Sequence, residues 1–182
     1  EDAIDSYQTA LNLNPRNSGA ANNLAVLLGA DGDLEGAETV LRKILTLNTH
    51  DLSAAVNLAD ILCRLALPEY LKEAENLCRG VINEAPDMAK AHSVLSQSMS
   101  IGDRRGEALG AAQTAVKLEP DNALFHEQVA DLQSKLGDNE AAELAARQSF
   151  KLNENSARSA GILGTALLGL SRAEEAVDWC LR

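Results

Sequence analysis

The sequence repeats with a period of about 34 residues, and this repeat limits the fold more than any other feature of the chain. A block with the pattern Ala-x-x-Leu-Ala-x-x-Leu begins at Ala21 and recurs at Ala55. Related blocks begin at His92, His126 and Ala160. Repeats of roughly 20–50 residues are typical of solenoids, in which each repeat is one supersecondary element. We place the repeat starts, which are evenly spaced except for one longer repeat, at Ser18, Leu52, Ala89, Ala123 and Ala157.

Each repeat contains two stretches in which hydrophobic residues recur every three or four residues, which is the period of a helix face. We therefore expect every repeat to be a hairpin of two helices, each of about 13 residues and about 20 Å. Small residues recur at one offset in each helix, where a bulky side chain would push the two helices apart. These positions are Ala25, Ala59, Ser96, Ala130 and Gly164 in the first helices and Ala37, Ala74, Ala108, Ala142 and Ala176 in the second.

Turn residues separate the two predicted helices of a repeat. Gly32-Asp33, Gly102-Asp103 and Gly137-Asp138 have Gly where the first helix should end and Asp where it can cap the second. The last repeat has Ser171–Glu174 instead, with the spacing of a capping box. Pro68 lies in the repeat that is three residues longer, and we expect it to end the first helix and lengthen the loop.

These boundaries predict how the chain is organised. The predicted segments are 1–17, the second helix of a truncated N-terminal repeat; 18–51, a repeat; 52–88, a repeat with a three-residue insertion; 89–122 and 123–156, two further repeats; and 157–182, an incomplete C-terminal repeat.

The repeat resembles that of the tetratricopeptide repeat family, whose pattern is Trp-x₂-Leu-Gly-x₂-Tyr, then Ala-x₃-Phe, then Pro, over about 34 residues. The leucine and small positions match over essentially the whole chain. Pro15, Pro86 and Pro120 occupy the terminal proline position, whereas Thr49 and Glu154 depart from it. Most aromatic positions hold Ala, His or Leu, in keeping with an aromatic content of 3%. The resemblance implies an all-α fold, a right-handed superhelical α-solenoid of helix-turn-helix repeats.

In this family the first helices line a concave face that commonly holds a peptide or another protein. Asn23 and Asn57 share one offset on that face, and their amides either hold a peptide backbone or are ordinary solvated side chains. The equivalent positions of the later repeats hold Val94, Gln128 and Ile162. A ladder of asparagines like that of the O-linked N-acetylglucosamine transferase superhelix is therefore incomplete. By this resemblance the positions that face inward are Asn22, Asn23, Val26, Val56, Asn57, Asp60, Arg64, Lys90, Ser93, Gln97, Glu127, Gln128, Asp131, Lys135, Arg158 and Thr165.

The charge and hydropathy patterns disfavour two classes of partner. Lys plus Arg is 16 and Asp plus Glu is 27, which gives a formal net charge of −11. Since phosphate binding depends on an excess of Lys and Arg, no nucleic-acid partner is expected. The longest uncharged run, between Arg158 and Arg172, is shorter than the roughly 20 apolar residues that span a membrane. The acidic balance favours a basic or polar protein partner that is attracted by electrostatic steering.

The cysteines indicate the compartment. Cys63, Cys78 and Cys180 form no CxxC pair, and their odd number argues against a disulfide framework. We therefore expect buried, free thiols and a reducing, cytoplasmic location, with a Cys63–Cys78 bridge as the minority alternative.

Catalysis, a cofactor and a metal ion are not expected, because the candidate motifs are incomplete. His92 and His126 share an offset in adjacent repeats, but a metal site requires further ligands and a second shell. The segment 31–36 imitates the start of a calcium loop, yet the position that should hold a bidentate Glu is Arg42. No phosphate loop, dinucleotide fingerprint or Ser-His-Asp grouping is present in the sequence.

The leading hypothesis is a non-catalytic protein–protein interaction scaffold that binds a peptide or protein segment on the concave face. One alternative is a regulatory or substrate-positioning arm of a larger enzyme, such as a glycosyltransferase. Another is a self-assembling scaffold, a homo-oligomer that forms through exposed solenoid ends. The chain starts and stops within predicted second helices, so we expect a segment of a longer protein or ends that pack against another copy.

Overall fold

The structure, a computed structural model, describes residues 3–180, and every regular element in that range is an α-helix. None of these helices is long and apolar enough to cross a lipid bilayer. The helices are α1 (Ala3–Leu13), α2 (Ser18–Ala30), α3 (Leu34–Leu47), α4 (Leu52–Leu65), α5 (Pro68–Glu84), α6 (Ala89–Ile101), α7 (Arg105–Leu118), α8 (Ala123–Leu136), α9 (Asn139–Leu152), α10 (Ala157–Gly169) and α11 (Ala173–Cys180).

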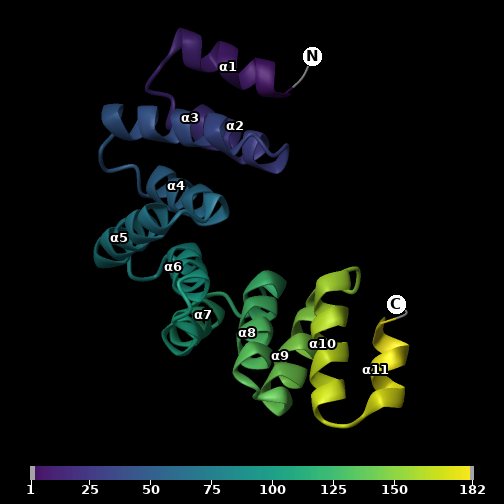
Figure 1. Ribbon diagram of the computed structural model, residues 1–182. Helices are drawn as coiled ribbons and strands as arrows, with labels where there is room; N and C mark the ends of the chain where they lie inside the picture. The colour runs from purple at the N-terminus through teal and green to yellow at the C-terminus, as the bar shows by residue number, and fades with distance from the viewer. Residues whose placement is uncertain (1–2, 181–182) are drawn as a thin grey trace. The chain divides into compact units, whose positions relative to one another are not determined.

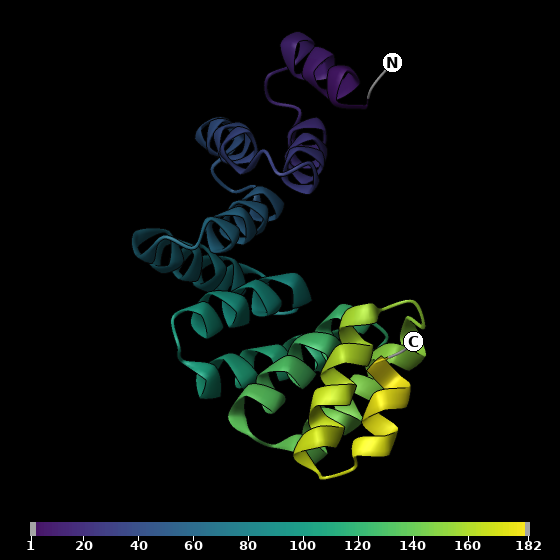
Figure 2. The same cartoon turned by 45° about the vertical axis from the view of Figure 1, so that its right-hand side comes forward.

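The chain forms two compact units that divide between Pro86 and Asp87. We call them the N-terminal body, with α1 to α5, and the C-terminal body, with α6 to α11. In the N-terminal body α1 packs on α2, and the hairpins α2–α3 and α4–α5 pack on each other through α3 and α4 (Figure 2). In the C-terminal body the hairpins α6–α7, α8–α9 and α10–α11 stack in the same way (Figure 1). The predicted all-α fold of stacked helical hairpins is confirmed.

The first helices α2, α4, α6, α8 and α10 begin at the residues that we took as repeat starts. They contain 13 or 14 residues, close to the predicted length. The division of the chain into repeats remains an interpretation of the sequence.

Small residues lie where helices come closest. Every position of the two predicted small-residue sets is buried, from Ala25 and Ala37 in the N-terminal body to Gly164 and Ala176 in the C-terminal body. Contact between helices therefore depends on low side-chain volume, as the sequence predicts. Ser96 occupies one of these positions with its hydroxyl buried and without a hydrogen-bond partner in the part of the chain that the structure describes.

Two of the predicted helix caps are confirmed and two are wrong. Asp33 and Asp138 cap α3 and α9 by accepting hydrogen bonds from backbone N–H groups three residues ahead. Asp103 is not a cap, because it has a left-handed backbone conformation (φ 61°). In the turn between α2 and α3 this conformation belongs to Gly32 instead. The cap of α7 falls on Arg104, which makes no capping side-chain hydrogen bond. Ser171 has the same left-handed conformation (φ 61°), so the predicted capping box does not form.

The three additional residues lengthen a helix rather than a loop. The proline at position 68 is the first residue of α5, which has 17 residues, and only Ala66 and Leu67 separate α5 from α4. Our expectation of a longer loop was wrong. Proline at the first position of a helix loses no intrahelical hydrogen bond, and its φ angle is already that of a helix, so Pro68 can begin α5.

Arg42 joins two successive second helices of the N-terminal body. Its Nη1 and Nη2 donate to the two carboxylate oxygens of Glu73 on α5 at 2.7 and 2.8 Å, and its Nε donates to Glu38 at 2.7 Å. The hydrogen bonds from Arg42 lower the pKa of Glu73. This pair therefore stabilises the fold above the usual glutamate pKa of about 4.3, and its contribution is lost as the pH falls through the lower, folded-state pKa.

Arg42→Met is expected to lower the free energy of unfolding by about 0.2–1 kcal/mol at neutral pH, since both side chains of the pair are partly exposed. The loss should shrink as the pH is lowered from about 7 to about 3. Urea denaturation at both pH values measures it. Arg79→Met, which removes an ion pair within α5 alone, is the matched control and should cost less. A loss of equal size at both pH values would show that the effect does not come from the ion pair between Arg42 and Glu73.

Candidate functional site

A polar cavity of about 360 Å³ lies in the C-terminal body between the first helices α6, α8 and α10. We call it the α6–α8 groove. It brings together Ser93, Gln97, Glu127, Gln128, Asp131, Lys135 and Arg158, all of them among the positions expected to face inward. The sequence reasoning missed four further lining residues, Ser100, Ile101, Leu124 and Leu132.

Helix periodicity places these side chains on the groove. Glu127, Asp131 and Lys135 are spaced by four residues on α8, and Ser93 and Gln97 have the same spacing on α6, so each set lies on one helix face. The Lys135 Nζ donates to Asp131 Oδ2 at 2.7 Å.

Gln128, which lines the groove, connects α8 to α6. Its Nε2 donates to the backbone carbonyl of Ser93 at 2.9 Å, and its Oε1 accepts from the Ser93 hydroxyl at 2.8 Å. A matching contact joins α4 to α2 in the N-terminal body, where Asn57 Nδ2 donates to Asn22 Oδ1 at 2.6 Å. Both pairs are 35 residues apart, so polar side chains at these offsets hold successive first helices together. The Nδ2 group of Asn57 therefore already donates a hydrogen bond within the chain.

Glu127 is a buried carboxylate at the edge of the groove, with an exposed fraction of 7%. Its Oε2 accepts hydrogen bonds from the hydroxyls of Ser156 at 2.8 Å and Ser159 at 3.0 Å. Its Oε1 lies 3.5 Å from Nε of Arg158, and Nη2 of Arg158 lies 3.8 Å from Asp131 Oδ2. The groove therefore contains two carboxylates, with Lys135 bonded to Asp131 and Arg158 held loosely beside both.

The other positions expected to face inward do not line this groove. Besides Asn22 and Asn57, two of them make contacts within the N-terminal body: Asn23 donates to the Tyr7 hydroxyl at 3.3 Å, and Arg64 donates to the Gly29 carbonyl at 2.6 Å. Val56 is fully buried, so it contributes to packing rather than to an accessible surface. The remaining ones, which are half-buried or exposed, are Val26, Asp60, Lys90 and Thr165.

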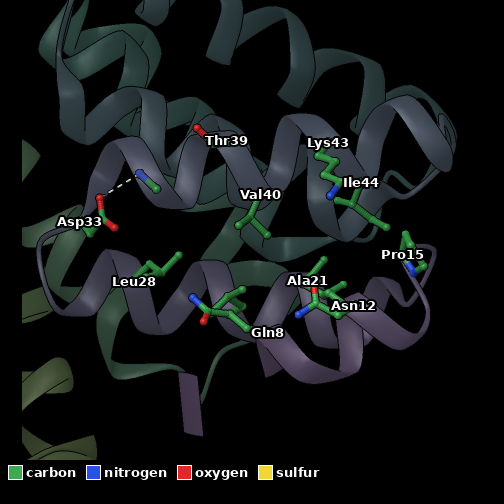
Figure 3. Close-up of a pocket in the computed structure, with 13 residues that line it drawn as sticks. Gln8, Asn12, Pro15, Ala21, Leu28, Asp33, Thr39, Val40, Lys43 and Ile44 are labelled. Atoms are coloured by element: carbon green, nitrogen blue, oxygen red, sulfur yellow. Dashed lines mark hydrogen bonds between the residues drawn. The ribbon is translucent and has the colours of Figure 1, made fainter. Parts of the chain in front are cut away.

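A second cavity, of about 460 Å³, lies in the N-terminal body between α1, α2 and α3. Figure 3 shows Asp33 near one end and Pro15 near the other, with Leu28, Val40 and Ile44 between them. Asp33 is engaged there, because its Oδ1 accepts from the Gly36 N–H at 2.9 Å. The sequence reasoning did not find this cavity. The available signal was that this repeat has Ala21 and Leu28 where the family pattern has the larger Trp and Tyr.

The structure gives no sign of reactivity or metal binding at Cys63, Cys78 and His126. Cys63 and Cys78 are buried and form no disulfide, and burial raises the pKa of each thiol to about 12, so both are protonated and unreactive at neutral pH. The predicted buried thiols are confirmed at these two positions; the side chain of Cys180 lies outside the described residues. The His126 ring bonds the Pro120 carbonyl at 2.7 Å. No group of three metal-ligating side chains occurs within residues 3–180.

Comparisons with known proteins agree with this architecture. Two tetratricopeptide repeat profiles match the chain, one at residues 6–39 and the other at residues 128–182. No curated protein matches the sequence.

Solved structures with the same fold include TTC0263, a thermophilic TPR protein of Thermus thermophilus, at a TM-score of 0.77 and 22% identity over 87% of this chain and 86% of that one. MamA has a TM-score of 0.70 and 18% identity over 87% and 91% of the two chains. YrrB, a TPR protein with an unusual peptide-binding site, has a TM-score of 0.64 and 18% identity over 97% and 89%. The profile matches and the stacked helical hairpins show that the chain contains tetratricopeptide repeats.

Proposed function

We propose that this chain is a protein-interaction scaffold that binds an extended peptide segment of a partner in the α6–α8 groove. The observation that carries the proposal is the groove itself, because a cavity of about 360 Å³ is lined by side chains from three successive first helices. Tetratricopeptide repeat proteins generally act as non-catalytic scaffolds, and the similarity in fold to YrrB, which has a peptide-binding site, supports the same mode here.

The chemistry of the groove suits an extended peptide. Gln97 lies half-buried on the groove wall, and its amide offers a donor and an acceptor to a peptide backbone. Ile101 and Leu124 are exposed at the groove and offer apolar contact to side chains of the partner. A lining of polar residues together with exposed apolar residues therefore suits both backbone recognition and side-chain recognition.

Gln97→Trp is expected to fill the groove and to weaken the binding of peptides by about tenfold or more, equivalent to about 1.4 kcal/mol. Peptides are first selected on the wild-type chain from a random display library and then titrated by fluorescence anisotropy. Gln113→Trp makes the same change at an exposed position of α7 and is the matched control, with no expected effect. Equal affinities for all three proteins would refute the proposed site.

The two other hypotheses from the sequence, a substrate-positioning arm of a larger enzyme and a self-assembling scaffold, remain untested predictions. Neither has a specific observation in its favour within residues 3–180.

A further inference from the structure

We infer that the α6–α8 groove recognises a positively charged side chain of its partner, an arginine or lysine, between Glu127 and Asp131, and that Arg158 occupies this place in the unbound chain. The inference rests on the proposed function and adds to it the chemistry of the partner. Arg158 acts in it as an internal competitor that the partner's cation displaces.

The Glu127 carboxylate is held in a fixed position. Two hydroxyls, from Ser156 and Ser159, hold its Oε2, so the side chain is oriented before any partner arrives. Oε1 is directed to the place that Arg158 approaches. A buried carboxylate has lost much of its hydration, and a cation near Oε1 would offset part of the cost that the two hydroxyl groups do not.

Arg158 is held only weakly by the two carboxylates. Its closest approaches to the two carboxylates are 3.5 and 3.8 Å, longer than the roughly 2.7–2.9 Å of a charge-assisted hydrogen bond. The side chain is 67% exposed. By contrast, Arg172 in the same body donates to both carboxylate oxygens of Glu143 at 2.8 Å. An exposed, loosely held arginine contributes little to stability, so an external cation can replace it at low cost.

The lining of the groove suits a long, positively charged side chain. Glu127 and Asp131 are one helical turn apart on α8, so their carboxylates face the same space. Lys135 engages Oδ2 of Asp131. Ile101 and Leu124 offer apolar surface to the methylene stem of an arginine or lysine. The net charge of −11 attracts a basic segment toward the chain as a whole.

The test uses three peptides, acetyl-Gly-Arg-Gly-amide, the same peptide with uncharged citrulline in place of arginine, and acetyl-Gly-Glu-Gly-amide, each titrated into the ¹⁵N-labelled full chain and followed by NMR. We expect the arginine peptide to shift the backbone resonances of Gln97, Glu127 and Asp131 and to bind about fivefold more tightly than the citrulline peptide. Asp131→Asn should weaken its binding, whereas Asp178→Asn, at an exposed position of α11, should not.

The decisive variant is Arg158→Ala, because the inference requires it to bind the arginine peptide about two- to fivefold more tightly. Arg147→Ala removes an exposed arginine of α9 and should change nothing. Unchanged or weaker binding by Arg158→Ala, equal binding of the arginine and citrulline peptides, or preference for the glutamate peptide would overturn the inference. Library-selected peptides that lack Arg and Lys distinguish the two proposals. If such peptides bind more weakly to the Gln97→Trp variant than to the wild-type chain, the proposed function holds, and only the recognition of a cationic side chain is refuted.

Discussion

Leu163→Ala is expected to lower the free energy of unfolding of the C-terminal body by about 2–5 kcal/mol. Leu163 on α10 is fully buried and belongs to a core cluster with Leu167, Ala130, Ala146 and Ala176. These residues come from four helices, so the side chain holds α8, α9, α10 and α11 together. The neighbours are mostly alanines, whose short side chains cannot move in to fill the space, so the cavity term should be large.

Trp179 provides the measurement. It is the one tryptophan of the chain, it packs against this cluster, and its ring meets the ring of Phe150 edge-on with centroids 4.9 Å apart. Urea denaturation followed by Trp179 fluorescence therefore reports on the C-terminal body. Leu168→Ala makes the same change at an exposed position of the same helix, and its effect should stay within about 0.5 kcal/mol. Similar losses for the two variants would show that this cluster does not hold the helices together.

Ala142→Trp is expected to destabilise the C-terminal body by about 1–3 kcal/mol or more through overpacking. Ala142 on α9 is fully buried at one of the small positions, and α9 packs tightly against α8. An indole ring there can be accommodated only if the two helices separate, which would also loosen the contacts of their neighbours.

Thermal denaturation followed by circular dichroism measures this effect without interference from the additional tryptophan. Leu144→Trp is the matched control, because Leu144 lies two residues away on the same helix with an exposed fraction of 72%. We expect a clearly lower melting temperature for Ala142→Trp and little change for Leu144→Trp. An unchanged melting temperature for Ala142→Trp would mean that the small residues are not required for contact between the helices.

Local features of the chain were predictable where one physical cause dominates. The first-helix starts, the caps at Asp33 and Asp138 and the buried alanines follow from helix periodicity, side-chain hydrogen bonding and volume, all of which act over a few residues. The errors occurred where two local rules competed. At Asp103 and Ser171 the backbone requires a left-handed residue, and this requirement overrides the capping preference of the side chain.

The candidate site was predictable only in part. The resemblance to the family selected Ser93, Gln97, Asp131 and other residues that the structure brings together in the groove. The resemblance also selected Val56, which is buried. The position of a residue within its repeat does not specify whether neighbouring repeats cover that residue. Leu124 was missed because an exposed leucine at the start of a helix has no distinguishing pattern in the sequence.

The sequence by itself determined that this chain consists of helical hairpins with small residues at their contacts, because helix periodicity and side-chain volume are properties of short segments. Only the tertiary structure decided which polar residues form a groove and which hold the stack together. The pairs Ser93–Gln128 and Glu127–Ser159 join residues about one repeat apart, 35 and 32 positions in the chain. Their contacts depend on the distance and rotation between successive hairpins, which side-chain packing sets across whole helices.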